Sequence, residues 1–91
     1  METGLEESLR QTVAALMRAT GEPQRVLASV LGLTQAQVSR RQSGTTPWSL
    51  HDADILAAHY GMPALDLLAG PTRACAALAR TRHTGEPGAH R

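Results

Sequence analysis

Residues 23–44, PQRVLASVLGLTQAQVSRRQSG, constrain the fold of this 91-residue chain more than any other segment. Apolar residues recur at helical spacing before Gly32, as they do on the buried face of a short helix. Pro23 suits a first helical turn, because the N–H that proline lacks has no partner there. Gly32 permits the left-handed backbone of a tight turn. The segment therefore predicts two helices, over 24–31 and 34–43, joined by a turn.

The second of these helices has a narrow apolar face, in which Val38 is the only strongly apolar residue. Thr34 and Gln37 form a capping-box pattern at its start, and Gly44 predicts its end. A helix that buries so little of itself presents most of its surface to something other than its own core. A turn followed by such a helix is typical of a helix-turn-helix, which places its second helix in the DNA major groove.

The rest of the chain also shows helical spacing of apolar residues. Further helices are expected over residues 3–19, 49–60 and 63–69, with an extension over 74–82. Thr3 with Glu6, and Ser49 with Asp52, form capping-box patterns. In the fourth helix the residues expected to face inward are Leu50, Ala53, Leu56, Ala57 and Tyr60. No segment alternates in the manner of a strand, so the predicted fold class is all-α.

Composition limits the size of the protein and the chemistry open to it. The length suits one domain, and 42% hydrophobic but only 2% aromatic residues predict a core of Leu, Val and Ala. A net charge of +1 argues against a protein that binds polyanions through bulk charge alone. The single cysteine, Cys75, excludes an intrachain disulfide and a cysteine-cluster zinc site. No apolar run approaches the ~18 residues of a membrane span, and no signal peptide precedes the first helix. The expected location is therefore the cytoplasm, associated with the nucleoid.

The pattern LA-x3-GL-TQ-x2-VS-R, followed by a glycine, resembles the lambda-repressor/Cro-type (XRE) helix-turn-helix family. The resemblance runs on to Leu68 and covers about two-thirds of the chain. It implies a five-helix, lambda-repressor-like bundle as a DNA-binding domain over residues 1–70. Residues 71–91 are then expected to form a C-terminal extension, with a helix over 73–82 and a disordered tail after it.

The same resemblance implies which side chains read DNA. The predicted base contacts are Gln35, Ala36, Gln37, Ser39 and Arg40. Chemistry supports this set, because glutamine pairs with adenine in a bidentate manner, arginine with guanine, and alanine meets a thymine methyl. The predicted phosphate contacts are Gln24, Arg41, Ser43, Thr45 and Thr46. Gln24 begins a helix, where the exposed N–H groups favour an anion.

Two residues at the end of the motif depart from the family pattern. The family usually has an apolar residue where Arg41 stands, and Glu or Leu where Gln42 stands. One branch reads VSRR-x-x-G followed by proline and an aromatic residue, as Pro47 and Trp48 do here. The Arg41 stem is therefore expected to pack against Trp48, while its head group reaches a phosphate or an acid.

The function implied is that of a sequence-specific transcriptional regulator of the phage-repressor or Cro type. It would bind double-stranded operator DNA as a homodimer, with half-sites about 34 Å apart on a pseudo-palindrome. An alternative is a protein-interaction module of the same fold, an antitoxin or antirepressor. Leu65, Leu68 and residues 74–78 are candidate dimer surfaces, unless the 74–82 segment only extends the bundle or forms a basic tail that touches the DNA backbone.

An enzyme or a metal protein is not expected. His51, Asp52, Asp54 and His59 lie in one predicted helix, but such groups are commoner as exposed polar residues than as metal ligands. No nucleophile is spaced with a base, and no cofactor, metal, membrane contact or small-molecule effector is predicted.

Overall fold

The computed structural model describes residues 4–84, and the side chains of residues 4–80. This part of the chain contains six helices and no strand. They are α1 (Leu5–Thr20), α2 (Gln24–Leu31), α3 (Gln35–Ser43), α4 (Leu50–Tyr60), α5 (Ala64–Leu68) and α6 (Pro71–Thr84). The all-α prediction is confirmed, and the sequence-predicted bundle of five helices gains a sixth.

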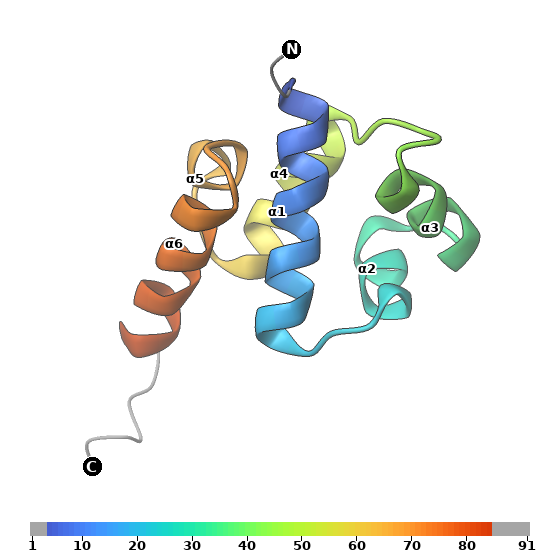
Figure 1. Cartoon of the computed structure of the whole chain (residues 1–91). Coiled ribbons are helices and arrows are strands. Elements are labelled where there is room, and N and C mark those ends of the chain that lie inside the picture. Colours follow the sequence, from blue (N-terminus) through green and yellow to red (C-terminus); the bar gives the residue numbers. More distant parts are fainter. Residues whose placement is uncertain (1–3, 85–91) are drawn as a thin grey trace.

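Helix α1 runs through the middle of the molecule (Figure 1). It packs against α5 and α6 on one side and against α3 on the other, while α2 contacts α3 and α4. Figure 1 shows α6 and α3 on opposite sides of α1. Helices α2 and α3 therefore lie together on one side of the bundle, and α3 is the outermost of the two.

The core consists of aliphatic side chains contributed by all six helices. The largest fully buried side chains are Val13, Leu16, Leu27, Val38, Leu56 and Leu67, together with Thr12. Thr12 is accommodated because its hydroxyl donates to the Ser8 carbonyl, 2.9 Å away on the preceding turn. The predicted Leu, Val and Ala core is therefore present, and the two aromatic residues, Trp48 and Tyr60, are buried in it as well.

Helix α6 is part of this core. Ala74, Ala77 and Leu78 are buried, and α6 packs along α1. Small alanine side chains let the two helices approach closely, so the 74–82 segment extends the bundle. Of the candidate dimer surface at residues 74–78, Ala74, Ala77 and Leu78 are buried within the protein, and only Ala76 is exposed. The tail predicted beyond this helix lies outside the described residues.

Two local expectations meet a different outcome. Helix α1 is preceded by Gly4 as its N-cap, with no side-chain cap hydrogen bond. Thr3, the predicted cap, lies outside the described residues. The prediction that Leu50 faces inward is wrong, because its side chain is 69% exposed. Leu50 is the first residue of α4, and it borders an open apolar groove with Leu5 and Leu9 rather than the closed core.

Candidate nucleic-acid interface

The turn between α2 and α3 is fixed by backbone hydrogen bonds. Gly32 has φ +70°, the left-handed conformation that ends α2. The Leu33 N–H then donates to the Ala28 carbonyl at 2.9 Å, and the Leu33 side chain packs against the core. These contacts set the direction in which the chain enters α3.

The start of α3 is a complete capping box. Thr34 Oγ1 accepts from the Gln37 N–H at 3.1 Å, and Gln37 Oε1 accepts from the Thr34 N–H at 2.8 Å. The capping prediction is therefore confirmed. Gln37 uses one lone pair of its side-chain oxygen in the capping box, whereas its amide NH₂ group takes no part in the box and is left to donate to another molecule.

The outward face of α3 carries polar side chains around one apolar anchor. Val38 is fully buried, and Gln35, Ala36, Ser39 and Arg40 are exposed. Ala36 and Arg40 are four residues apart and share one side of the helix. Arg40 makes no side-chain ion pair within the described residues. Four of the five predicted base-contact residues are thus exposed together, and Gln37 is half-buried beside them.

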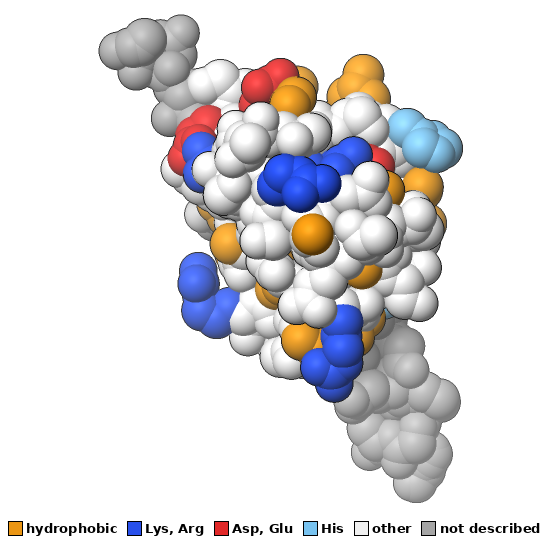
Figure 2. Space-filling model, turned by 90° about the vertical axis from the view of Figure 1, so that its right-hand side faces the viewer, with side chains coloured by type: hydrophobic (Ala, Val, Ile, Leu, Met, Phe, Trp, Pro, Cys, Tyr) orange, Lys and Arg blue, Asp and Glu red, His pale blue; other side chains and the backbone are white. Residues whose placement is uncertain are grey.

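Figure 2 shows the side of the molecule that carries α3. Arginine side chains lie in the middle and along the lower part of this face, whereas acidic side chains gather along its upper edge. The net charge of the chain is only +1, but the acidic side chains lie mostly outside the middle of this face, where the arginines are.

The hydrogen-bonding groups of the loop after α3 are largely bonded within the protein. The N–H groups of Thr45 and Thr46 both donate to the Arg40 carbonyl, at 3.0 and 3.2 Å, and that of Gly44 donates to Arg41 at 3.2 Å. Ser43 Oγ lies 3.0 Å from Thr45 Oγ1. Ser43 Oγ also donates to the Arg40 carbonyl at 3.0 Å, so both of these exposed hydroxyls, like the backbone N–H groups of the predicted phosphate loop, already have partners within the protein.

Arg41 points to α4. Its Nε donates to Asp52 Oδ2 at 3.1 Å, its Nη1 donates to the Gln37 carbonyl at 3.3 Å, and its guanidinium carbon lies 5.9 Å from the Trp48 ring centre. Of the two partners expected for this head group, the acid is the one present. Gln42, the other departure, accepts the Trp48 indole N–H at 3.0 Å.

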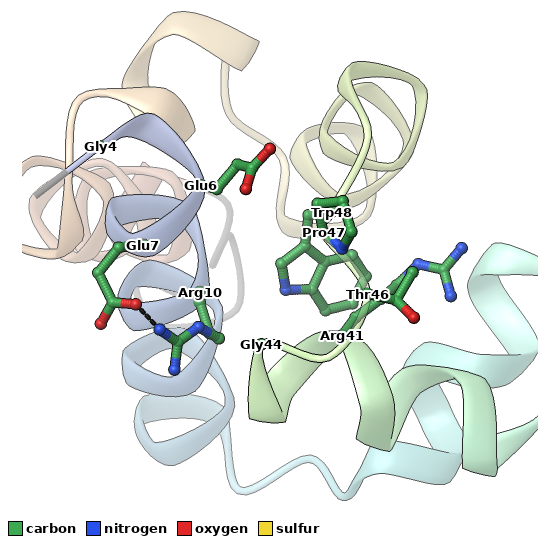
Figure 3. A pocket seen from close by; sticks show the side chains of 9 residues that line it. All are labelled: Gly4, Glu6, Glu7, Arg10, Arg41, Gly44, Thr46, Pro47 and Trp48. Carbon is green, nitrogen blue, oxygen red and sulfur yellow. Dashed lines mark ion pairs between the residues drawn. The ribbon is translucent and has the colours of Figure 1, made fainter.

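Arg10 of α1 also reaches this region, although no local sequence pattern indicates it. Its guanidinium carbon would lie 3.4 Å from a Cβ atom added at Gly44, and it pairs with Glu7 on its own helix. Figure 3 shows these residues around a cleft of about 240 Å³ that also includes Trp48. Residues 10 and 44 are far apart along the chain, so only the fold brings them together.

The far end of α4 is tied to the segment before α2. His59 Nε2 lies 3.0 Å from Glu22 Oε1. The neighbouring Tyr60 hydroxyl is buried and makes no hydrogen bond within the described residues. Burial, and then the nearby Glu22 charge, raise the pKa of Tyr60 above its usual range. The described residues include no group of three or more His, Cys, Asp or Glu side chains that could hold a metal ion.

The fold and this face define a small all-helical domain that displays one polar helix. The family model of the BetR domain matches residues 5–83, and the chain belongs to that family. Membership of the BetR domain family indicates a regulatory, DNA-binding helical domain. No curated protein and no solved structure matches the chain. Within residues 4–84, no helix has the length and apolar character needed to cross a membrane.

Proposed function

We propose that this protein is a sequence-specific transcriptional regulator that inserts α3 into the major groove of operator DNA. The observation that carries the proposal is the surface of α3, where polar and arginine side chains are exposed around the single buried anchor Val38. Repression then follows from occlusion, because a protein bound at an operator blocks access of polymerase to the same DNA. The lambda-repressor/Cro-type relationship is part of this proposal.

Each exposed residue of α3 has a role that matches its chemistry. Arg40 donates to guanine O6 and N7, Gln35 pairs with adenine, and Ala36 contacts a thymine methyl. Ser39 lies beside them and suits either a base or a phosphate. Gln37 contributes its NH₂ group, since its oxygen belongs to the capping box.

Phosphate contacts fix the helix in the groove. Gln24 is the first residue of α2, where the free N–H groups of the helix end attract an anion. Ser43, Thr45 and Thr46 contribute hydroxyls from the loop after α3. Arg41 was predicted to join them, but we leave it out of the proposed set because its head group is already paired with Asp52.

The test is selection of binding sites from random duplexes, followed by titration of the selected site at moderate salt. Arg40→Ala is expected to cost ~1–3 kcal/mol and to relax the preference at one base pair. Arg73→Ala is the matched control, because it removes the same charge from an exposed position on α6, which lies on the side of α1 opposite α3. The absence of any sequence-selective binding by the wild-type protein would refute the proposal.

A homodimer is proposed as the binding form, with its half-sites one helical turn, about 34 Å, apart. Leu65 of α5 is 79% exposed and is the candidate for this contact, because Ala74, Ala77 and Leu78 of the alternative surface are buried within the bundle. Sedimentation of the wild type and of Leu65→Gln is the measurement. A dimer that persists unchanged in Leu65→Gln would place the interface elsewhere.

A second candidate function is a protein-interaction module, an antitoxin or antirepressor. The observation in its favour is an apolar groove of about 480 Å³. It is lined by Gly4, Leu5, Glu6, Leu9, Trp48, Leu50 and Leu68. Tight binding of a partner protein together with failure to select any DNA sequence would favour this function over DNA binding.

A further inference from the structure

The end of α3 and the start of α4 share one carboxylate. Asp52 Oδ2 accepts from Arg41 Nε and from the Ser49 N–H, both at 3.1 Å, and the Asp52 N–H donates to Ser49 Oγ at 2.9 Å. The Asp52 residue is 7% exposed. A carboxylate this buried is stabilised by a cationic partner and by hydrogen bonds, and Asp52 has both. Asp52 therefore caps α4 and pairs with α3 through the same oxygen.

The guanidinium of Arg41 is enclosed by these partners. Only 18% of its side chain is exposed, and besides Asp52 it contacts the Gln37 carbonyl and the face of Trp48. Trp48 is in turn bonded to Gln42 of α3. The two consecutive arginines consequently differ: Arg40 extends from the exposed face of α3, whereas Arg41 ties α3 to α4.

We propose that Asp52 is a specificity-determining positioning residue: by holding Arg41, it fixes the orientation of α3 and withholds one positive charge from the DNA backbone. This inference rests on the proposed function. Its consequence is that α3 presents Arg40 as its one unpaired arginine within the described residues, so affinity depends on base contacts more than on general attraction to phosphates.

The experiment compares Asp52→Asn with Asp54→Asn. Both variants remove one negative charge from α4, but Asp54 is exposed and Asp52 is not. Asparagine retains an oxygen that can accept the Ser49 N–H, so the cap of α4 is preserved. Affinities for the selected operator and for an unrelated duplex are measured over a series of salt concentrations.

Asp52→Asn is expected to bind the unrelated duplex more tightly, with a salt dependence steeper by about one phosphate contact. The ratio of operator to unrelated affinity is expected to fall by about fivefold or more, the loss expected when one bidentate base contact is misaligned. Asp54→Asn is expected to change the ratio and the salt slope much less. Equal effects of the two variants would overturn the inference.

A double variant identifies the source of the added affinity. Asp52→Asn combined with Arg41→Gln removes both charges and leaves two side chains that can hydrogen-bond to each other. We expect its salt slope on unrelated DNA to return to the wild-type value while the specificity ratio stays low. A slope that remains steep would mean that Arg41 is not the source, and the inference would fail.

Two readouts keep these outcomes distinct. Circular dichroism and Trp48 fluorescence establish that each variant is folded before binding is compared. A wild-type protein with no selective binding contradicts the proposed function itself. A selective wild type whose ratio is unaffected by Asp52→Asn contradicts only the role assigned to Asp52.

Discussion

Substitution of Val38 by alanine tests whether one side chain attaches α3 to the bundle. Val38 is fully buried and is the only buried residue of α3. The change removes two methyl carbons, worth about 1.6 kcal/mol at ~0.8 kcal/mol per buried carbon. The cavity left behind adds up to about 1 kcal/mol, because the surrounding helices relax only in part. We expect the free energy of unfolding to fall by about 2–3 kcal/mol.

The assay is urea denaturation followed by the fluorescence of Trp48, the single tryptophan of the chain, which is 5% exposed and bonded to Gln42 of α3. Val30→Ala is the matched control. The same atoms are removed from a half-exposed position outside the core cluster, so a loss below about 1 kcal/mol is expected. A loss of less than about 0.5 kcal/mol in Val38→Ala, or equal losses in the two variants, would refute the assignment of Val38 as the anchor.

Three further predictions follow from local geometry. Thr34→Ala removes the capping box of α3 and is expected to cost ~1 kcal/mol in thermal or urea unfolding, with Thr45→Ala, an exposed loop residue, as the control. Gly44→Ala is expected to cost about 1–2 kcal/mol from its φ of +87°. Gly21→Ala is expected to cost a similar amount, because Gly21 also has a positive φ of +76° and the Arg10 guanidinium carbon, 3.4 Å from a new Cβ at Gly44, lies at ordinary van der Waals distance; a cost confined to one of the two sites would contradict the backbone argument. Because the pKa of Tyr60 is raised in the folded protein, the Tyr60 hydroxyl of the unfolded chain loses its proton at a lower pH than that of the folded chain. The free energy of unfolding is therefore retained below a pH of about 10 and falls above it. Tyr60→Phe is expected to match the wild type near pH 7 and to lack this alkaline decline, measured by urea unfolding at several pH values; a decline of the same size in the variant would contradict the argument.

The ends of the helices could be predicted from the sequence where a short-range interaction determines them. Thr34 with Gln37, and Ser49 with Asp52, are capping boxes in the structure as predicted, because both partners of each bond lie within three residues. Gly32 also ends its helix as expected, in a left-handed conformation that glycine adopts without strain.

Contacts between distant segments could not be predicted in the same way. The capping box identified Asp52 as a cap of its own helix, but its pairing with Arg41 depends on how α3 and α4 meet. The prediction that Leu50 faces inward was wrong because helical spacing shows only which residues share one face of a helix. It does not show how far along that face the neighbouring helices extend. Residues 74–82 left three alternatives open, since alanine is equally compatible with an exposed helix and a closely packed one. The base and phosphate contacts remain predictions.

The position of α6 has a practical consequence for measuring binding. Helix α6 lies on the side of α1 opposite α3, and its residue Ala76 is exposed (Figure 1). A dye attached at Ala76→Cys, in a Cys75→Ser background, would be separated from the α3 surface by the thickness of α1. Fluorescence anisotropy of that dye would then report the slower tumbling of a DNA complex without a label at the surface that reads the bases.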